Sequence, residues 1–265
     1  MRTVLLLLAA AVLHAQPKSV LLEDFTWPEL QDAIASGKTT AIYYSGSIEQ
    51  NGPGMALGKH VFIARYVAQR IADKLGNALV YPTMPFAPTG DPIRKTGHMK
   101  FPGTITVSPQ AFGLIAHDVA VSAISAGFKN VVLMSDHGGE AQTELKEVAA
   151  RLNAQWAPKG AHVYYIPDLY FKEKDQAAKY LIERKLTVDE HAGAHDTSQL
   201  MYIDKEHRWI RKDKLVKGDG KNGVNGDPTQ ASPEHGQVFI NLKTDDAVAQ
   251  IRQLIAAGGS SPRRP

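Results

Sequence analysis

Apolar positions in this chain alternate between two periodicities, and the alternation predicts strands that take turns with helices. Short apolar or β-branched runs predict the strands, and these lie at residues 39–45, 77–86, 103–107, 130–136 and 161–168. Longer segments with helical spacing of apolar residues predict the helices, at residues 26–37, 60–76, 108–127, 139–156 and 245–258. This order predicts an α/β fold, a three-layer α/β/α sandwich with a mostly parallel central sheet in one domain.

Polar residues gather directly after two of the predicted strands. The first cluster, in residues 46–60, contains Glu49, Asn51 and His60, and the second contains Asp136, His137 and Glu140. Ligands of open parallel sheets bind outside the carboxyl ends of the strands, so both clusters lie where a site is expected. A third cluster, "DEHAGAHDTS" at residues 189–198, adds further histidines and carboxylates.

Imidazole and carboxylate groups together suit a zinc, manganese or iron ion. Structural interpretations remain open for each cluster. Glu49 and Asn51 fit loop residues that satisfy backbone groups, and His137 fits a helix cap or a core histidine. The segment 191–198 fits a helix N-terminus with Asp196 or Thr197 as its cap. The spacing within one cluster is not a specific metal signature; the joint occurrence of three clusters favours a metal site.

The ends of the chain predict processing and disorder. A basic start, an apolar run and the small residue Ala15 predict a signal peptide over residues 1–15, cleaved after Ala15, and hence a periplasmic or secreted protein. Residues 16–258 would form the folded domain and residues 259–265 a disordered tail. The apolar run is too short for a membrane span.

Composition narrows the chemistry further. The chain has no cysteine, which excludes thiolate ligands and disulfides. The net charge of +3 comes from scattered basic residues, which argues against a nucleic-acid partner. The glycine- and aspartate-rich stretch at residues 212–236 predicts a long loop.

Four motifs in order make the chain resemble the creatininase (creatinine amidohydrolase) family over residues 39–201. They are "GSIEQNGPGMALGKH", "FPGTITVS", "SDHGGE" and "HAGAHDTS". The resemblance implies an α/β/α sandwich, often a homo-oligomer such as a hexamer, and one or two divalent ions that serve hydrolysis of a C–N bond.

Site residues carry over from the resemblance position by position. Glu49 matches a metal-binding glutamate and His137 a metal-binding histidine, while His60 stands where the family has a bridging aspartate. His191 matches a histidine that contacts substrate and moves a proton, and Asp196 replaces a glutamate.

Departures from the family pattern predict an altered site. Asn51 takes the place of a metal-binding histidine, and the further substitutions are at Gly54, Glu140 and Ala194. We therefore predict one ion, with zinc favoured and manganese or iron as alternatives, held by Glu49, His60 and His137. Asn51, Asp136 and Glu140 would be additional site residues.

The expected function is hydrolysis of an amide or lactam bond in a small molecule. Metal-activated water would be the nucleophile, and His191 and Asp196 would be the catalytic residues. Two alternatives stay open: an inactive ligand-binding or assembly protein with the same fold, and a lactonase or deaminase-like enzyme on the same scaffold.

Overall fold

A parallel four-stranded sheet forms the centre of the molecule in the computed structural model, which describes residues 19–258. Its strands are β1 (Thr40–Ser45), β2 (Ala78–Val80), β3 (Asn130–Ser135) and β4 (His162–Tyr165), in the spatial order β2-β1-β3-β4. The predicted signal peptide and the predicted tail lie outside the described residues.

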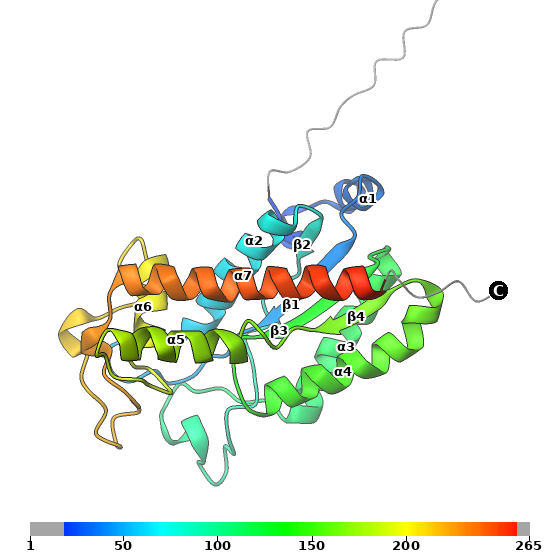
Figure 1. Cartoon of the computed structure of the whole chain (residues 1–265). Helices are drawn as coiled ribbons and strands as arrows, with labels where there is room; N and C mark the ends of the chain where they lie inside the picture. Colours follow the sequence, from blue (N-terminus) through cyan, green and yellow to red (C-terminus); the bar gives the residue numbers. More distant parts are fainter. Residues whose placement is uncertain (1–18, 259–265) are drawn as a thin grey trace, which may run out of the picture.

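Helices cover both faces of this sheet, which gives the three layers seen in Figure 1. The α-helices are α1 (Trp27–Ala35), α2 (Lys59–Leu75), α3 (Pro109–Ala126), α4 (Glu140–Trp156), α5 (Phe171–Glu183), α6 (Ala194–Ile203) and α7 (Pro233–Gly258). One apolar core joins the sheet to α2, α6 and α7, and the other joins it to α1, α3 and α4. The α/β sandwich predicted from the sequence is confirmed. Within residues 19–258, no helix is both long and apolar enough to cross a membrane.

Strands β1 and β3 lie side by side at the middle of the sheet, and every residue of both is buried. Their pairing runs from Thr40 opposite Asn130 to Ser45 opposite Ser135, so the two strands end at the same level. The backbone N–H of Asp136 then donates to the carbonyl of Ser45, at 2.8 Å. This register brings the two polar segments that follow the strands to one edge of the sheet.

The structure departs from the predicted elements in three ways. The stretch 103–107 is not a strand, since only Thr106 forms an isolated bridge, to Ala87. Helix α5 was not predicted. The last helix begins at Pro233, not at residue 245, and it continues through Gly236, which the sequence had placed in the long loop.

Gly236 is needed where α7 crosses α6. A Cβ added there would lie 1.9 Å from the carbonyl oxygen of Ser198 and 2.9 Å from the Cβ of Tyr202. The absence of a side chain therefore allows the backbones of the two helices to approach closely.

We predict that Gly236→Ala lowers the free energy of unfolding by roughly 1–3 kcal/mol, because the helices must separate to accept the methyl group. Gly113→Ala is the matched control in α3, where the added Cβ would meet the mobile carboxylate end of Glu144. Urea denaturation should show the loss only for Gly236→Ala. Equal stability of the two variants would contradict this account of the α6–α7 contact.

Candidate metal centre

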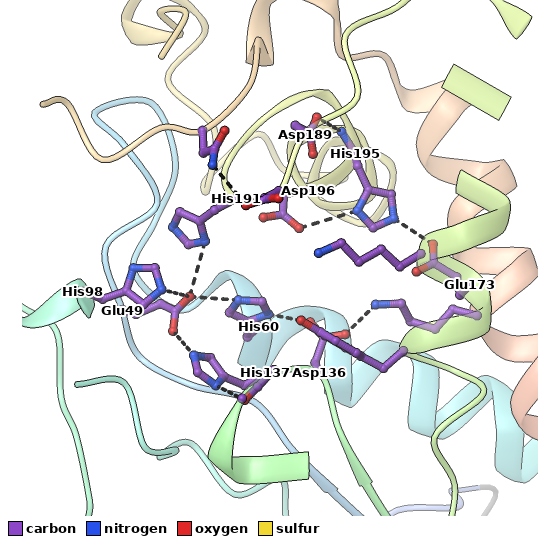
Figure 2. Close-up of a pocket in the computed structure, with 17 residues that line it drawn as sticks. Glu49, His60, His98, Asp136, His137, Glu173, Asp189, His191, His195 and Asp196 are labelled. Atoms are coloured by element: carbon purple, nitrogen blue, oxygen red, sulfur yellow. Dashed lines mark hydrogen bonds and ion pairs between the residues drawn. The ribbon is translucent and has the colours of Figure 1, made fainter. Parts of the chain in front are cut away.

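A cavity of about 300 Å³ opens at the carboxyl edge of the sheet. Its walls come from the segments after β1 and β3, from α5 and α7, and from the segment that leads into α6 (Figure 2). The histidines and carboxylates that line it are Glu49, His60, His98, Asp136, His137, Glu173, Asp189, Glu190, His191, His195 and Asp196. The three polar clusters of the sequence therefore meet in one place.

Gly46, the first residue after β1, allows the chain to pass close to the backbone of α2. A Cβ at Gly46 would lie 2.6 Å from the backbone nitrogen of Val61, near the start of α2. The chain can therefore turn tightly, which places Glu49 over the end of β1 and His60 beside it in the first turn of α2.

Glu49 is the centre of the cluster, and four imidazole rings face its buried carboxylate (Figure 2). The Nε2 atoms of His60 and His137 lie 3.0 Å and 2.9 Å from its two oxygens. His98 Nε2 and His191 Nδ1 each lie 3.8 Å from Oε1.

Three of these rings have their other nitrogen beside a hydrogen-bond acceptor. His60 Nδ1 lies 2.7 Å from Asp136 Oδ2, and His137 Nδ1 lies 3.0 Å from the carbonyl of Gly138. His191 Nε2 lies 2.9 Å from the carbonyl of Gln50. When those nitrogens donate, the nitrogens that face Glu49 present lone pairs. This arrangement is typical of metal-binding histidines, whose far N–H is held by a carboxylate or a carbonyl.

His98 has the opposite orientation. The Gln50 side-chain oxygen accepts from the backbone N–H of Gly52, at 3.0 Å, so the Gln50 amide nitrogen points at His98 Nδ1, also at 3.0 Å. That amide donates, so His98 Nδ1 accepts and its Nε2 carries the proton. The same Gln50 amide nitrogen also lies 3.1 Å from His191 Nε2, and the Gln50 backbone carbonyl lies 2.9 Å from it, so this atom of His191 has both a donor and an acceptor beside it.

The electrostatics keep Glu49 ionised. Burial opposes its ionisation, but His60 and His137 outweigh burial and hold its pKa well below the usual range. Burial also lowers the pKa of His191, to about 3, with a further contribution from the charge of Lys59. His191 is therefore neutral at pH 7, as a metal ligand must be.

The donor set fits a divalent ion. Bonds of ~2.1 Å to nitrogen and oxygen place tetrahedral ligand atoms about 3.4 Å apart. The distances from Glu49 to the facing nitrogens, between 2.9 and 3.8 Å, bracket that value. A carboxylate oxygen and a lone-pair nitrogen at 2.9 Å also repel each other unless a proton or a cation lies between them. Among the described residues, the set of three ligand atoms that lie within 4.8 Å of one another comes from Glu49, His98 and His191, and it includes neither His60 nor His137.

Two other carboxylates around the cavity, Asp136 and Asp196, already pair with lysines. Asp136 Oδ1 accepts from Lys243 Nζ at 2.6 Å. Burial alone would raise the pKa of Asp136, yet Lys243 and His60 together lower it to about 2. Asp196 pairs with Lys59.

A further pair joins α5 to α6. Glu173 Oε1 lies 2.7 Å from His195 Nε2, and burial of His195 is outweighed by this carboxylate, which raises the pKa of the imidazole. Asp189 has no such partner. Burial, followed by the nearby charge of Asp196, raises the Asp189 pKa to about 6.

Two predicted additional residues lie away from the ligand cluster. Asn51 turns back onto its own loop, and its amide donates to the carbonyls of Glu49 and Ala56 at 2.9 and 3.2 Å. Glu140 is exposed at the start of α4 and does not line the cavity. The predicted residues Glu49, His60, His137, Asp136, His191 and Asp196 all line it.

Sequence reasoning missed Gln50, His98, Glu173 and the two buried lysines, Lys59 and Lys243. His98 lies three residues before the "FPGT" motif, which was a usable signal. Lys243 and Glu173 come from α7 and α5, and no local pattern in the sequence connects them to the site.

Comparisons with known proteins identify the family of the chain. The family model described as creatinine amidohydrolase matches residues 23–251. A creatinine amidohydrolase of Pseudomonas putida is 28% identical over 120 residues, which is 45% of each chain. A mycofactocin precursor peptide peptidase of Mycolicibacterium smegmatis is 26% identical over 222 residues, 74% of this chain and 78% of the relative.

Solved creatininase structures share the fold. A crystal structure of creatinine amidohydrolase has a TM-score of 0.73 at 19% identity and covers 89% of this chain and 98% of its own. Related creatininase structures are described as "Zn-Zn type" and as "Creatininase Mn". The match over residues 23–251 shows that this chain belongs to the creatininase family of metal-dependent amidohydrolases.

Proposed function

We propose that the protein hydrolyses an amide or lactam C–N bond in a small molecule, with one divalent ion held at Glu49. The observation that supports this most is the buried, ionised carboxylate of Glu49, which imidazole nitrogens of His60, His98, His137 and His191 face at 2.9 to 3.8 Å. When bound, the ion would polarise the scissile carbonyl and lower the pKa of a water to about 7. Zinc and manganese both suit this nitrogen and oxygen donor set.

His98 is placed to act as a proton donor in the reaction. Its Nε2–H faces the cluster, and burial lowers its pKa, so the neutral ring can donate a hydrogen bond or a proton to the leaving nitrogen. Gln50 sets this tautomer from the far side of the ring. His191 has the same placement, with one nitrogen at Gln50 and the other facing Glu49, so proton transfer by His191, as predicted from the sequence, stays a prediction.

A groove of about 820 Å³ beside the cavity gives the rest of the substrate room. The two share His98, His191 and Asn225. The groove is lined by Phe101 and by the glycine-rich segment 218–226, which is part of the loop predicted from the sequence. Its size fits a substrate larger than a single small ring, such as a short peptide or a substituted lactam.

The ligand assignment predicts which histidine variants lose the metal. His60→Ala and His137→Ala should each weaken zinc binding by more than roughly 100-fold, because changes in residues that only orient ligands already cost about 10–100-fold. His98→Ala should keep the affinity within a few-fold. Competition titration against a zinc chelator measures this, with His117→Ala, a half-buried histidine of α3 outside the cavity, as control. Loss of zinc in His98→Ala and retention in His60→Ala would contradict the assignment.

Measurements of activity should distinguish the role of His98 from that of the metal ligands. On whichever amide the wild type cleaves in a panel of creatinine, substituted lactams and short peptide amides, we expect His98→Ala to lower kcat roughly 100-fold or more at unchanged metal content. Gln50→Glu should shift the pH profile, because its carboxylate would accept from His98 Nδ1 and reverse the tautomer. A wild-type-like kcat for His98→Ala would exclude this role.

The same panel tests the alternatives. Cleavage of lactones but not of lactams would favour the lactonase. A protein that binds zinc, manganese or iron at no detectable level after stripping and reconstitution would support the inactive binding protein. Extraction of the metal with a chelator should abolish amide cleavage, and re-addition of the ion should restore it.

A further inference from the structure

The two lysines buried around the metal centre occupy places that are unfavourable for a cation. Lys59 is fully buried, and it is the first residue of α2, where the positive end of the helix dipole repels an ammonium group. Transfer of a lone ammonium from water into such a place costs several kcal/mol. A partner must therefore compensate the charge.

Asp196 is that partner. One of its oxygens pairs with Lys59 and also accepts from the backbone N–H of Ala192, at 2.8 Å. Burial would raise the pKa of this carboxyl, but Lys59 is foremost among the cations that hold it well below the usual range. Asp196 is therefore an ionised carboxylate that lines the cavity while its negative charge is already neutralised from behind.

Asp136 and Glu173 show the same pattern, whereas Glu49 and Asp189 have no lysine or arginine partner in the described residues. Lys243 neutralises Asp136, and His195 faces Glu173. The partners of Glu49 in the described residues are imidazole nitrogens and the hydroxyl of Ser47, at 2.8 Å. A divalent ion that approaches Asp196 would meet the Lys59 charge across the same carboxylate, whereas Glu49 has no lysine or arginine partner in the described residues.

We propose that Lys59 is a built-in counter-cation, which neutralises Asp196 and so limits this centre to a single divalent ion at Glu49. The proposal rests on the proposed function, because it presumes that an ion binds at Glu49. A related fold is described as a "Zn-Zn type" creatininase. In this chain, the ammonium group of Lys59 supplies one positive charge next to Asp196, whereas a second divalent ion bound to Asp196 would supply two.

Metal stoichiometry tests this without any substrate. The full-length protein is stripped with a chelator, equilibrated with excess Mn²⁺ and then with Zn²⁺ in separate experiments, and freed of unbound metal. Bound metal is measured by mass spectrometry of the element against protein concentration, and by native mass spectrometry. We expect one ion per wild-type chain and two in Lys59→Met, which keeps the aliphatic stem and exposes the Asp196 charge. Added metal should raise the Tm of Lys59→Met more than that of the wild type.

Two matched variants make the result specific. Lys59→Met combined with Asp196→Asn removes both charges and should return to one ion. Lys172→Met removes a lysine from another ion pair, with Asp246, outside the lining of the cavity, and should also bind one. If Lys59→Met does not fold, Lys59→Gln replaces it with a polar side chain of similar length.

The outcomes separate the two proposals. Two ions in the wild type, or one ion in a folded Lys59→Met, would overturn the role of Lys59 and leave the metal site at Glu49 intact. No ion in the wild type would instead overturn the proposed function.

Discussion

The whole site depends on a carboxylate, Glu49, that is ionised in the interior of the protein. Only 1% of its surface is exposed, so its charge must be compensated within a few ångströms. The fold does this with imidazoles brought by the end of β3, by the start of α2 and by the segment before α6. In the absence of an ion, His60 compensates this charge as a proton donor, which agrees with its raised pKa, and when an ion is bound the same nitrogens would present lone pairs to it, with Asp136 and the Gly138 carbonyl at the far sides of two rings. Such an arrangement stabilises a bound cation.

The structure gives a role to two residues that depart from the family pattern. Asn51, where the resemblance implies a metal-binding histidine, braces the loop that carries Glu49 by bonding two of its carbonyls. His60, where the resemblance implies a bridging carboxylate, connects Glu49 to Asp136 through its two nitrogens. The two carboxylates outweigh burial and raise the pKa of His60, and Lys243 pairs with Asp136 on its other side. These changes are compatible with the single ion that we propose.

The sequence predicted what local pattern controls. The apolar and β-branched runs in the sequence predicted β1 and β3. The polar residues after these strands, Glu49 and His137, were expected to lie close together because parallel strands end at one edge of the sheet. What depends on distant contacts was not predictable. Gly236 looked like part of a loop because glycine disfavours helices, yet α7 needs it to pass Ser198. Lys243 reaches the site only because α7 begins twelve residues before its predicted start, at Pro233 instead of residue 245.

The most direct test is a crystal structure of the zinc-loaded protein with anomalous data collected at the zinc edge. The account predicts one strong peak per chain, in contact with Glu49, His60 and His137, while Lys59 remains paired with Asp196 and His98 remains bonded to Gln50. A peak bound by His98 in place of His60 and His137, a second peak at Asp196, or no peak near Glu49 would contradict it.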